Sequence, residues 1–507
     1  MTRRLCGLFA IDLRSLAAFR IAVGTILLID VAIRAGDFSA HYTEAGVLPL
    51  SALRETLGES TWRWSLYTLS PTDCWAAALL GLTALCGGLL VLGWWTRVAT
   101  AAAWVLVLSV HNRVPVVINA GDTLLHALLL WAIFLPLGGR WSVDAWRRAR
   151  RAVPARLGPA LETVCSPPSA AILLQMALLY ACSGFFKLGN GEWWDGMSLY
   201  YVMSFDAYAR PAAAWMLQHP NLLAVLTWGT VALEIGGPLA AFCPWWTAPI
   251  RLAVIASFVA FHLGIELTMT VGLFSWVSLA GWLLFVPAGF WEWFAPRQGF
   301  TATPAEPAKR EMRGICPGRV VAGAIVLVLL GFTVYWNATG FRSTDEKRRP
   351  DWTRAVMQAT GLRQEWRMFT RPPKHDGWPR AVAKLMGGGE WDLLEDKPGF
   401  DWRRRELPSS MAPNHRWRKF YSVLIGRRHS HLRPYFCRYL AWRFEASHEA
   451  EVQSVRLYQV QEITGAPGEE DRLVRRLLHE ESIRSQGAFL DAVEKDNVER
   501  YEIHPGI

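Results

Sequence analysis

Several ionisable side chains lie inside long apolar segments of this sequence. Lys187 ends an apolar run that begins near Ala170, and the next acidic residue along the chain is Glu192. An ammonium group costs about 3 kcal/mol or more at a bilayer centre, so such a lysine is functional, paired or extended to the headgroups. A lysine partly removed from water loses its proton more easily and can then act as a general base. Its substrate would have to be soluble in lipid.

Other polar residues recur at the helical spacing of four, which places both members of a pair on one face of a helix. These pairs are Ser183 with Lys187, Asp122 with His126, and His262 with Glu266. The topology derived below places Asp122, Lys187 and Glu266 in the outer part of the bilayer, with His111 just above and His262 a turn deeper. We therefore predict one site at this depth. Its predicted catalytic residues are Lys187, His262 and Asp122, and its predicted substrate-binding residues are Glu266, Ser183 and His111.

Structural roles compete with this interpretation. Lys187 could reach the outer interface or pair with an acid, Asp122 could cap a helix, and the His262–Glu266 pair could be a structural hydrogen bond. We interpret Arg20 and Glu234 as stabilising helix packing and leave them outside the site.

Composition points to a membrane protein. Of the 507 residues, 52% are hydrophobic and 19% are charged, and apolar runs long enough to span a bilayer stop near residue 337. The net charge is +10, but many basic residues lie in short loops beside the apolar runs. That distribution is typical of membrane topology and not of a nucleic-acid-binding face. The eight cysteines are scattered without a CxxC motif, which predicts neither a disulfide framework nor a zinc site.

The fold class is therefore an α-helical polytopic membrane protein with about nine transmembrane helices and a C-terminal extracytoplasmic α+β domain. Residues 1–337 form the transmembrane domain and residues 338–507 the soluble domain. The predicted spans are Ser15–Ala35, Cys74–Trp94, Arg97–Val110, Asp122–Leu137, Ala170–Leu188, Leu222–Phe242, Leu252–Thr270, Phe274–Trp293 and Val320–Trp336.

Basic residues in the short loops set the orientation. The N-terminus, the loop Arg140–Arg156, Arg251 and the link Arg297–Arg319 belong on the cytoplasmic side. The C-terminal domain then lies outside the cytoplasm, in the membrane of what we expect to be a bacterial cell. Membrane lipids are expected partners and nucleic acid is not.

The C-terminal domain has its own pattern. Trp378–Met386 and Glu390–Leu394 flank three glycines and predict two short strands, and Val452–Ile463 predicts a third. The segment Asn414–Phe444 is basic and aromatic and is predicted to be helical. The last 35 or so residues are rich in Glu and Arg, which predicts a surface helix or partial disorder.

Taken in order, several short stretches resemble the HTTM family, the membrane domain shared with vitamin K-dependent γ-glutamyl carboxylase. These stretches are Ser15–Ile21, His41–Thr43, His111–Arg113, Phe134–Gly138, Ser183–Leu188 with Trp193–Gly196, and Phe261–His262. Trp366–Phe369 and Arg433–Phe436 are similar to the outer domain of bacterial members. The end of the Lys187 helix also resembles DoxX-type membrane proteins.

The resemblance implies a chemistry. In the carboxylase a lysine deprotonates vitamin K hydroquinone, oxygen converts the quinol into a strong base and finally an epoxide, and that base removes a γ-proton from a peptide glutamate, to which carbon dioxide adds. Lys187 matches the position of that lysine, and His262 matches a histidine position. Asp122 stands where the animal enzyme has a histidine, which places proton handling and carboxylation in question. The implied ligands are a reduced quinone of the vitamin K or menaquinol type and an exported polypeptide, with no metal.

Two other function classes remain open. One is a non-enzymatic membrane protein, either a transporter or an assembly factor, in which the charged residues serve packing or substrate passage. The other is a metal-dependent membrane oxidase that uses the pairs Asp122/His126 and His262/Glu266.

Overall fold

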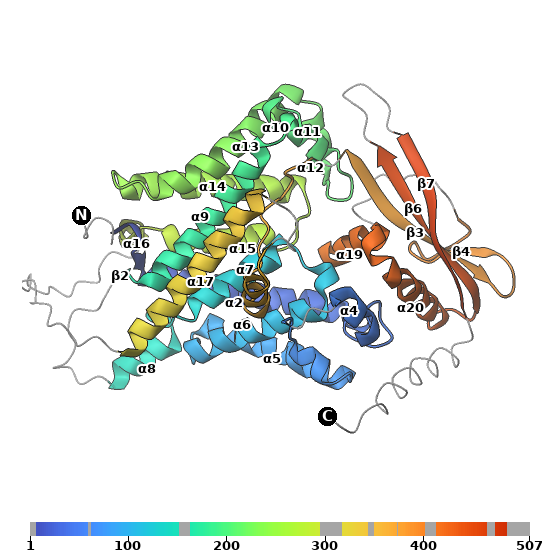
Figure 1. Ribbon diagram of the computed structural model, residues 1–507, viewed down its shortest axis with the longest axis horizontal. Helices are drawn as coiled ribbons and strands as arrows, with labels where there is room; N and C mark the ends of the chain where they lie inside the picture. The colour runs from blue at the N-terminus through green and yellow to red at the C-terminus, as the bar shows by residue number, and fades with distance from the viewer. Residues whose placement is uncertain are drawn as a thin grey trace, which may run out of the picture.

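The computed structural model describes residues 7–58, 62–151, 163–294, 317–342, 349–372, 374–400, 412–463 and 472–483. A helical domain occupies one end of the molecule, and a sheet with two helices occupies the other (Figure 1). The basic link 297–316 and the residues from 484 to the C-terminus lie outside the described residues, so the predictions for those segments stay predictions.

Six described helices are long and apolar enough to cross a membrane. They are α2 (Leu13–Gly36), α5 (Asp73–Leu92), α9 (Pro167–Leu188), α13 (Pro220–Ala241), α14 (Thr247–Thr268) and α17 (Pro317–Arg342, apolar over Val320–Phe341). Three others complete the helical domain: α6 (Thr96–Arg113), α7 (Ala120–Ala132) and α15 (Phe274–Trp282), the last continued by a 3₁₀ turn η4 (Leu283–Phe285).

The predicted number of about nine spans is not confirmed, because some apolar segments form short helices. The 13 residues of α7 rise about 20 Å, less than the hydrocarbon thickness of about 30 Å. Pro136 follows α7, and Pro287 follows η4, where the missing N–H of proline ends the helical hydrogen bonding. These short helices pack inside the bundle, and α7 is buried at nearly every position.

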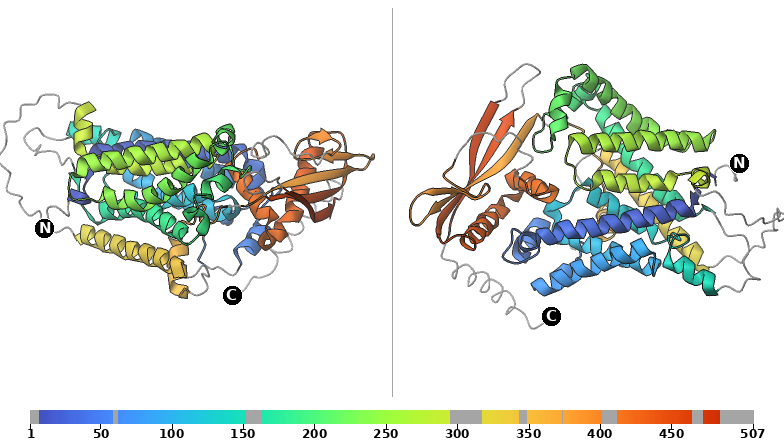
Figure 2. Two further views of the ribbon diagram at one scale, coloured as in Figure 1. Left: turned by 90° about the horizontal axis from the view of Figure 1, so that it is seen from above. Right: turned by 180° about the vertical axis from the view of Figure 1, so that it is seen from behind.

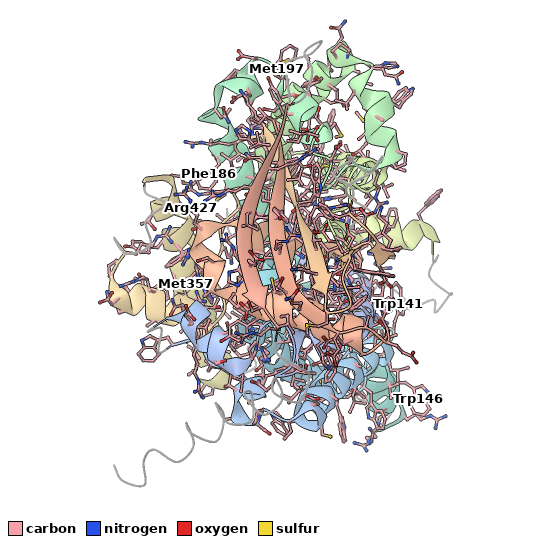
Figure 3. The ribbon with its side chains drawn as sticks, turned by 90° about the vertical axis from the view of Figure 1, so that its right-hand side faces the viewer. Trp141, Trp146, Phe186, Met197, Met357 and Arg427 are labelled. Atoms are coloured by element: carbon pink, nitrogen blue, oxygen red, sulfur yellow. The ribbon has the colours of Figure 1, made fainter. Side chains whose placement is uncertain are left out.

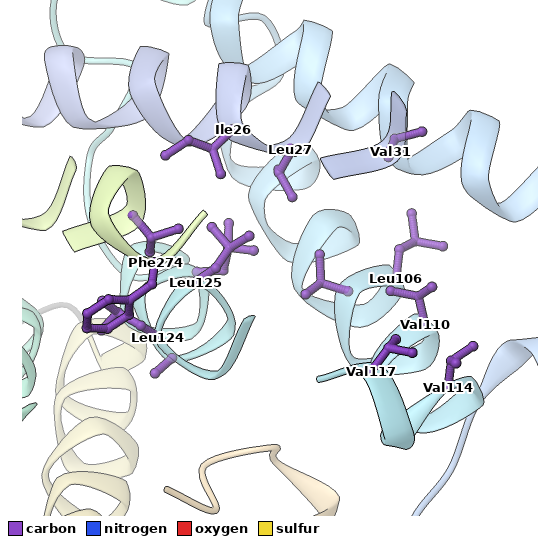
Figure 4. Close-up of a cluster of buried hydrophobic side chains, with 14 of the residues drawn as sticks. Ile26, Leu27, Val31, Leu106, Val110, Val114, Val117, Leu124, Leu125 and Phe274 are labelled. Carbon is purple, nitrogen blue, oxygen red and sulfur yellow. The ribbon is translucent and has the colours of Figure 1, made fainter. Parts of the chain in front are cut away.

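The core of the helical domain lies where α2, α6, α7 and α15 meet. Ile26 and Leu27 from α2 face Leu106 and Val110 from α6 on one side and Leu124 from α7 on the other (Figure 4). Small residues allow closer packing elsewhere, since a Cβ added at Gly24 would lie 2.8 Å from the carbonyl oxygen of Gly87 on α5. The core therefore fixes the helices whose ends carry the polar residues.

Short helices join the long ones. They are α3 (Phe38–His41), α4 (Leu50–Leu57), α8 (Val143–Arg151), α10 (Gly191–Trp194), α11 (Ser198–Met203), α12 (Pro211–Leu217), α16 (Ala288–Phe294) and α18 (Asp351–Ala359), with the 3₁₀ turns η1 (Leu66–Leu69) and η2 (Pro115–Val117). A two-stranded pair, β1 (Ile11–Asp12) with β2 (Thr163–Val164), lies at the end of the domain away from the large sheet (Figure 1). Cys165, next to β2, is disulfide-bonded, which corrects the expectation drawn from the scattered cysteines.

The C-terminal domain contains a five-stranded antiparallel sheet in the order β5-β4-β3-β6-β7. Its strands are β3 (His375–Leu385), β4 (Glu390–Asp392), β5 (Lys397–Pro398), β6 (Val452–Ile463) and β7 (Arg472–Ser482). The strand predicted over Val452–Ile463 and the pair around the three glycines are confirmed. The prediction of a helix or disorder for the last residues is wrong over β7, because this segment pairs with β6 from Ser454 to Ile463.

Two helices separated by a 3₁₀ turn η7 (Arg427–Leu432) join the sheet to the membrane helices. They are α19 (His415–Ile425) and α20 (Arg433–Glu445), which confirms the helical prediction for Asn414–Phe444. Figure 2 shows α19 between the sheet and the ends of the membrane helices, and Figure 3 shows the strands in front of the helical domain when that end faces the viewer. The α+β character of this domain is thus as predicted, and α19 is one of the elements that contact the helical domain, together with β3 and η7.

Candidate functional site: a lysine cavity and an arginine cluster

Lys187 lies in the last turn of α9. This helix starts with a reciprocal capping box between Ser166 and Ser169, and Pro167 occupies its first turn, so its start is well defined. The Lys187 side chain is only 3% exposed. Its Nζ donates to Ser183 Oγ at 2.6 Å, one turn back along the helix, as their spacing predicts.

Glu234 on α13 is the partner of this lysine. Lys187 Nζ lies 2.8 Å from Oε1 and 2.6 Å from Oε2 of Glu234. Close packing of the two helices makes this possible, because a Cβ added at Gly184 would lie only 2.6 Å from the Ile235 side chain. Glu234 therefore belongs to the site, although the sequence interpretation assigned it to helix packing.

A cavity of about 410 Å³ opens beside the Lys187–Glu234 pair, and we call it the lysine cavity. The Trp193 ring centre lies 5.1 Å from Lys187 Nζ. The cavity walls are mostly apolar and come from both domains. The lining residues are Asn119, Ala120, Tyr180, Lys187, Trp193, Leu199, Val202, Met203, Tyr208, Thr230, Glu234, Phe261, Ile265, Met269, Val271, Phe274, Met368, Phe369 and Lys419.

His262 lies next to this cavity but does not line it. Its Nε2 is 2.6 Å from the Tyr180 hydroxyl, which also accepts a hydrogen bond from Trp282 Nε1 at 3.1 Å. Tyr180 does line the cavity, so His262 can act on a ligand only through that hydroxyl. Glu266, the other half of the predicted pair, does not meet His262, and its carboxylate lies 3.4 Å from Arg210.

Asp122 and His111 lie in a second group of buried charges, which we call the arginine cluster: Asp30, Arg34, His111, Asp122 and Arg416. Arg416 of α19 lies 2.9 Å from Asp122 and also bonds to Asp30. Arg34 contacts Asp30 at 2.8 Å and Asp122 at 3.2 Å. The cluster therefore ties the C-terminal domain to α2 and α7.

Asp122 also caps its helix. Asn119 is the N-cap residue of α7, and the Asp122 carboxylate accepts a hydrogen bond from the Asn119 N–H at 2.9 Å. His111 Nε2 lies 3.5 Å from the same carboxylate. The capping role weighed for Asp122 is thus real, and it coexists with two arginine contacts.

The predicted pairs do not converge on one metal position. His126 stacks on Trp104, and its Nδ1 lies 3.3 Å from the Gly361 carbonyl oxygen. Within the described ranges, no group of three or more His, Cys, Asp or Glu side chains is placed to hold a metal ion.

The six predicted site residues thus divide into four places. Lys187 and Ser183 meet at the lysine cavity, Asp122 and His111 meet in the arginine cluster, His262 is separated from the cavity by Tyr180, and Glu266 faces Arg210. The common depth inferred from topology stays a prediction.

The sequence reasoning also missed residues that line or support these sites. The sequence could have indicated Glu234, because a carboxylate inside an apolar span needs a partner of opposite charge and Lys187 needs one as well. The sequence did not indicate Lys419 or Arg416. Both lie on a basic, aromatic helix, and its sequence does not reveal which face packs against the helical domain. Burial lowers the pKa of the Lys419 ammonium from its ordinary value.

The fold is that of a mostly helical protein with six helices long and apolar enough to cross a membrane, and its C-terminal domain contributes to the wall of a cavity. The family model described as the HTTM domain matches residues 9–291. The chain therefore belongs to the HTTM family, as its resemblance predicts. Searches of curated proteins and of solved structures gave no match to this chain.

Proposed function

We propose that this HTTM protein is a carboxylase-like membrane enzyme that oxidises a lipid-soluble quinol at the lysine cavity, with Lys187 as the base. The single observation that carries the proposal is an amine of an apolar helix, 3% exposed, on the wall of a largely apolar cavity. The cavity and the C-terminal domain would face the extracytoplasmic side, in line with the loop charges.

The chain's own residues supply a way to handle the proton. Lys187 and Glu234 share one proton when they form an ion pair. The proposal requires a form in which Glu234 holds the proton and Lys187 is a neutral amine. The neutral amine is the form that can accept a proton from an acidic hydroxyl.

The cavity suits a flat, apolar reactant. Phe261, Phe274 and Phe369 supply aromatic wall, and Val202 and Ile265 supply aliphatic wall. Such lining favours rings that carry few polar groups. A quinol would supply an acidic hydroxyl, and its reaction with oxygen to an epoxide and water balances without a further reductant.

The other predicted residues take supporting roles in this proposal. His262 would orient the Tyr180 hydroxyl toward the ligand. Asp122 and His111 would fix the outer domain through the arginine cluster, and that domain would position an exported polypeptide whose glutamate is carboxylated. Glu266, on the outer side near Arg210, would meet the polypeptide rather than the quinol.

One observation favours a non-enzymatic role, as a transporter or an assembly factor. The Lys187 charge is already compensated by Glu234, and a compensated buried pair is also how membrane proteins hold helices together. In that case Lys187 would stabilise the contact between α9 and α13 and perform no chemistry.

The test is epoxide formation by the purified full chain with reduced menaquinone or vitamin K and oxygen. We expect wild type to form epoxide above a protein-free blank, and Lys187→Ala to lower the rate by about 100-fold or more. Lys384→Ala, which removes an exposed lysine of β3, is the matched control and should match wild type. If wild type, Lys187→Ala and the blank agree, the quinol proposal fails. Full complementation of a deletion strain by a Lys187→Ala, His262→Ala double variant would favour the non-enzymatic role.

A further inference from the structure

Lys419 is a second lysine on the wall of the lysine cavity, and it comes from the other domain. It lies on α19 of the C-terminal domain, whereas Lys187 lies on membrane helix α9. The two side chains differ in their partners. Lys187 is held by a carboxylate, whereas Lys419 has neither a hydrogen-bond acceptor nor a carboxylate partner within the described part of the chain.

The two arginines of α19 both have partners. Arg416 is bound by Asp30 and Asp122. Arg418 donates to the Thr270 carbonyl oxygen and lies over the Tyr208 ring, with 5.0 Å between its guanidinium carbon and the ring centre. Lys419 is thus the basic residue of this helix whose charge is left uncompensated toward the cavity.

The charges on the cavity wall therefore do not cancel. The acidic and basic side chains of the lining are two lysines and one glutamate, and the Lys187–Glu234 pair has no net charge as a unit, so one positive charge remains. A partly buried cation without a partner is costly, because its lost hydration is not replaced. An anion in the cavity would replace it, and a charge-assisted hydrogen bond in an apolar setting is among the stronger ones.

We propose that Lys419 makes the lysine cavity selective for an amphipathic anion, with an apolar ring or chain in the cavity and a carboxylate or phosphate at the Lys419 ammonium. The inference rests on the proposed function only in taking the lysine cavity as a ligand site. A quinol of the vitamin K or menaquinol type carries neither a carboxylate nor a phosphate, so the anion is a second ligand of this cavity. Lys419 also gives the C-terminal domain a direct role in binding, because the cation is presented by α19.

Binding of two molecules of one shape tests the proposal. The full chain in phosphatidylcholine nanodiscs is titrated by calorimetry with 2-naphthoate, which is anionic at pH 7, and with 2-naphthamide, which is neutral. Titrations into empty nanodiscs are subtracted. We expect wild type to bind the naphthoate about tenfold or more tightly than the amide.

The variants locate the preference. Lys419→Gln should bind both probes equally, with the amide affinity unchanged, and Lys419→Met provides a second neutral side chain if the glutamine variant does not fold. Lys419→Arg and the surface control Lys384→Gln should keep the preference. A wild type without preference overturns the proposal, and so does a preference that persists in Lys419→Gln or Lys419→Met.

A further titration, with phosphatidylglycerol in the nanodisc, identifies the source of the anion. Because binding is measured and not turnover, the result also separates this inference from the proposed function. If phosphatidylglycerol in the nanodisc weakens naphthoate binding to wild type but not to Lys419→Gln, the anion is a lipid headgroup; if not, it is a separate ligand. No turnover is needed, so an inactive protein that shows the preference retains the anion site, and an active one without it loses only this inference.

Discussion

The lysine cavity and the arginine cluster lie at the same end of the membrane helices and treat buried charge in opposite ways. In the arginine cluster each carboxylate faces two guanidinium groups, and the members fill the space between α2, α7 and α19. In the lysine cavity one ion pair and one unpaired ammonium border an open space. The comparison teaches that buried charges which fully neutralise one another hold two domains together. Buried charges that do not cancel beside a cavity indicate a ligand site.

The largest expected effect comes from removing Arg416 from the arginine cluster. Arg416→Ala leaves the buried carboxylates of Asp30 and Asp122 without one of their two guanidinium partners, and breaking a buried pair costs about 3–5 kcal/mol. We expect a loss of folding free energy near the upper value, measured by denaturant unfolding of the detergent-solubilised protein. The matched control is Arg438→Ala, whose half-exposed pair with Glu481 should contribute about 1 kcal/mol or less. Equal effects of the two variants would contradict the distinction drawn here.

The next largest effect concerns the Lys187–Glu234 pair at the lysine cavity. Glu234→Gln removes the charge that compensates Lys187 and keeps the size of the side chain. We expect a loss of about 3 kcal/mol, the lower end for a broken buried pair, because the amine borders the cavity and keeps its hydrogen bond to Ser183. Unfolding midpoints for Glu234→Gln and for the double variant Glu234→Gln, Lys187→Met measure the coupling. Recovery of most of the stability in the double variant is expected, and its absence would show that the pair is not the cause.

A lone buried carboxylate at the domain interface should respond to pH. Asp376 lies beside a smaller cavity of about 240 Å³, and burial raises its pKa to about 6, despite hydrogen bonds from the N–H groups of Ala207 and Gly377. Between pH 4 and 6 the unfolded state binds fewer protons than the folded state, so Asp376 makes the protein less stable as pH rises through this window. The difference is about 2–3 kcal/mol for a shift of this size.

The measurement is the unfolding free energy at pH 4 and at pH 7 for wild type and Asp376→Asn. The variant should lose this component of the pH dependence, while Asp351→Asn, at an exposed carboxylate, should keep it. An unchanged pH dependence in Asp376→Asn would mean that the interface tolerates the charge as well as water does.

The smallest effect concerns the link between His262 and the lysine cavity. Tyr180→Phe removes the hydroxyl that bonds His262 and Trp282 and leaves the ring in place. We expect a loss of about 1 kcal/mol, typical of one hydrogen bond, seen as a small fall in the unfolding midpoint. A much larger loss would show that this hydroxyl belongs to a structural network whose polar groups are all paired, as the charges of the arginine cluster are.

Local features of the fold were readable from the sequence, and contacts between distant segments were not. The strand Val452–Ile463 follows from alternation, and Lys187 is visible because an apolar run ends on a charge. The partners are separated by 47 residues for Glu234 and by 294 residues for Asp122 and Arg416, and no periodic pattern encodes such a distance. A rule that each intramembrane charge needs an opposite one would have selected Glu234. Nothing comparable marks Lys419, since its significance depends on which face of α19 docks.

The path of Arg416 across the domain boundary has a consequence for biogenesis. Asp30 precedes Arg416 by 386 residues and Asp122 precedes it by 294, so a ribosome inserts both acids into the membrane long before their shared counterion is translated. Until then, Arg34 alone has to neutralise them. A chain truncated ahead of α19 would carry that imbalance permanently, and the membrane-embedded part would reach its mature state only after α19 has been translated.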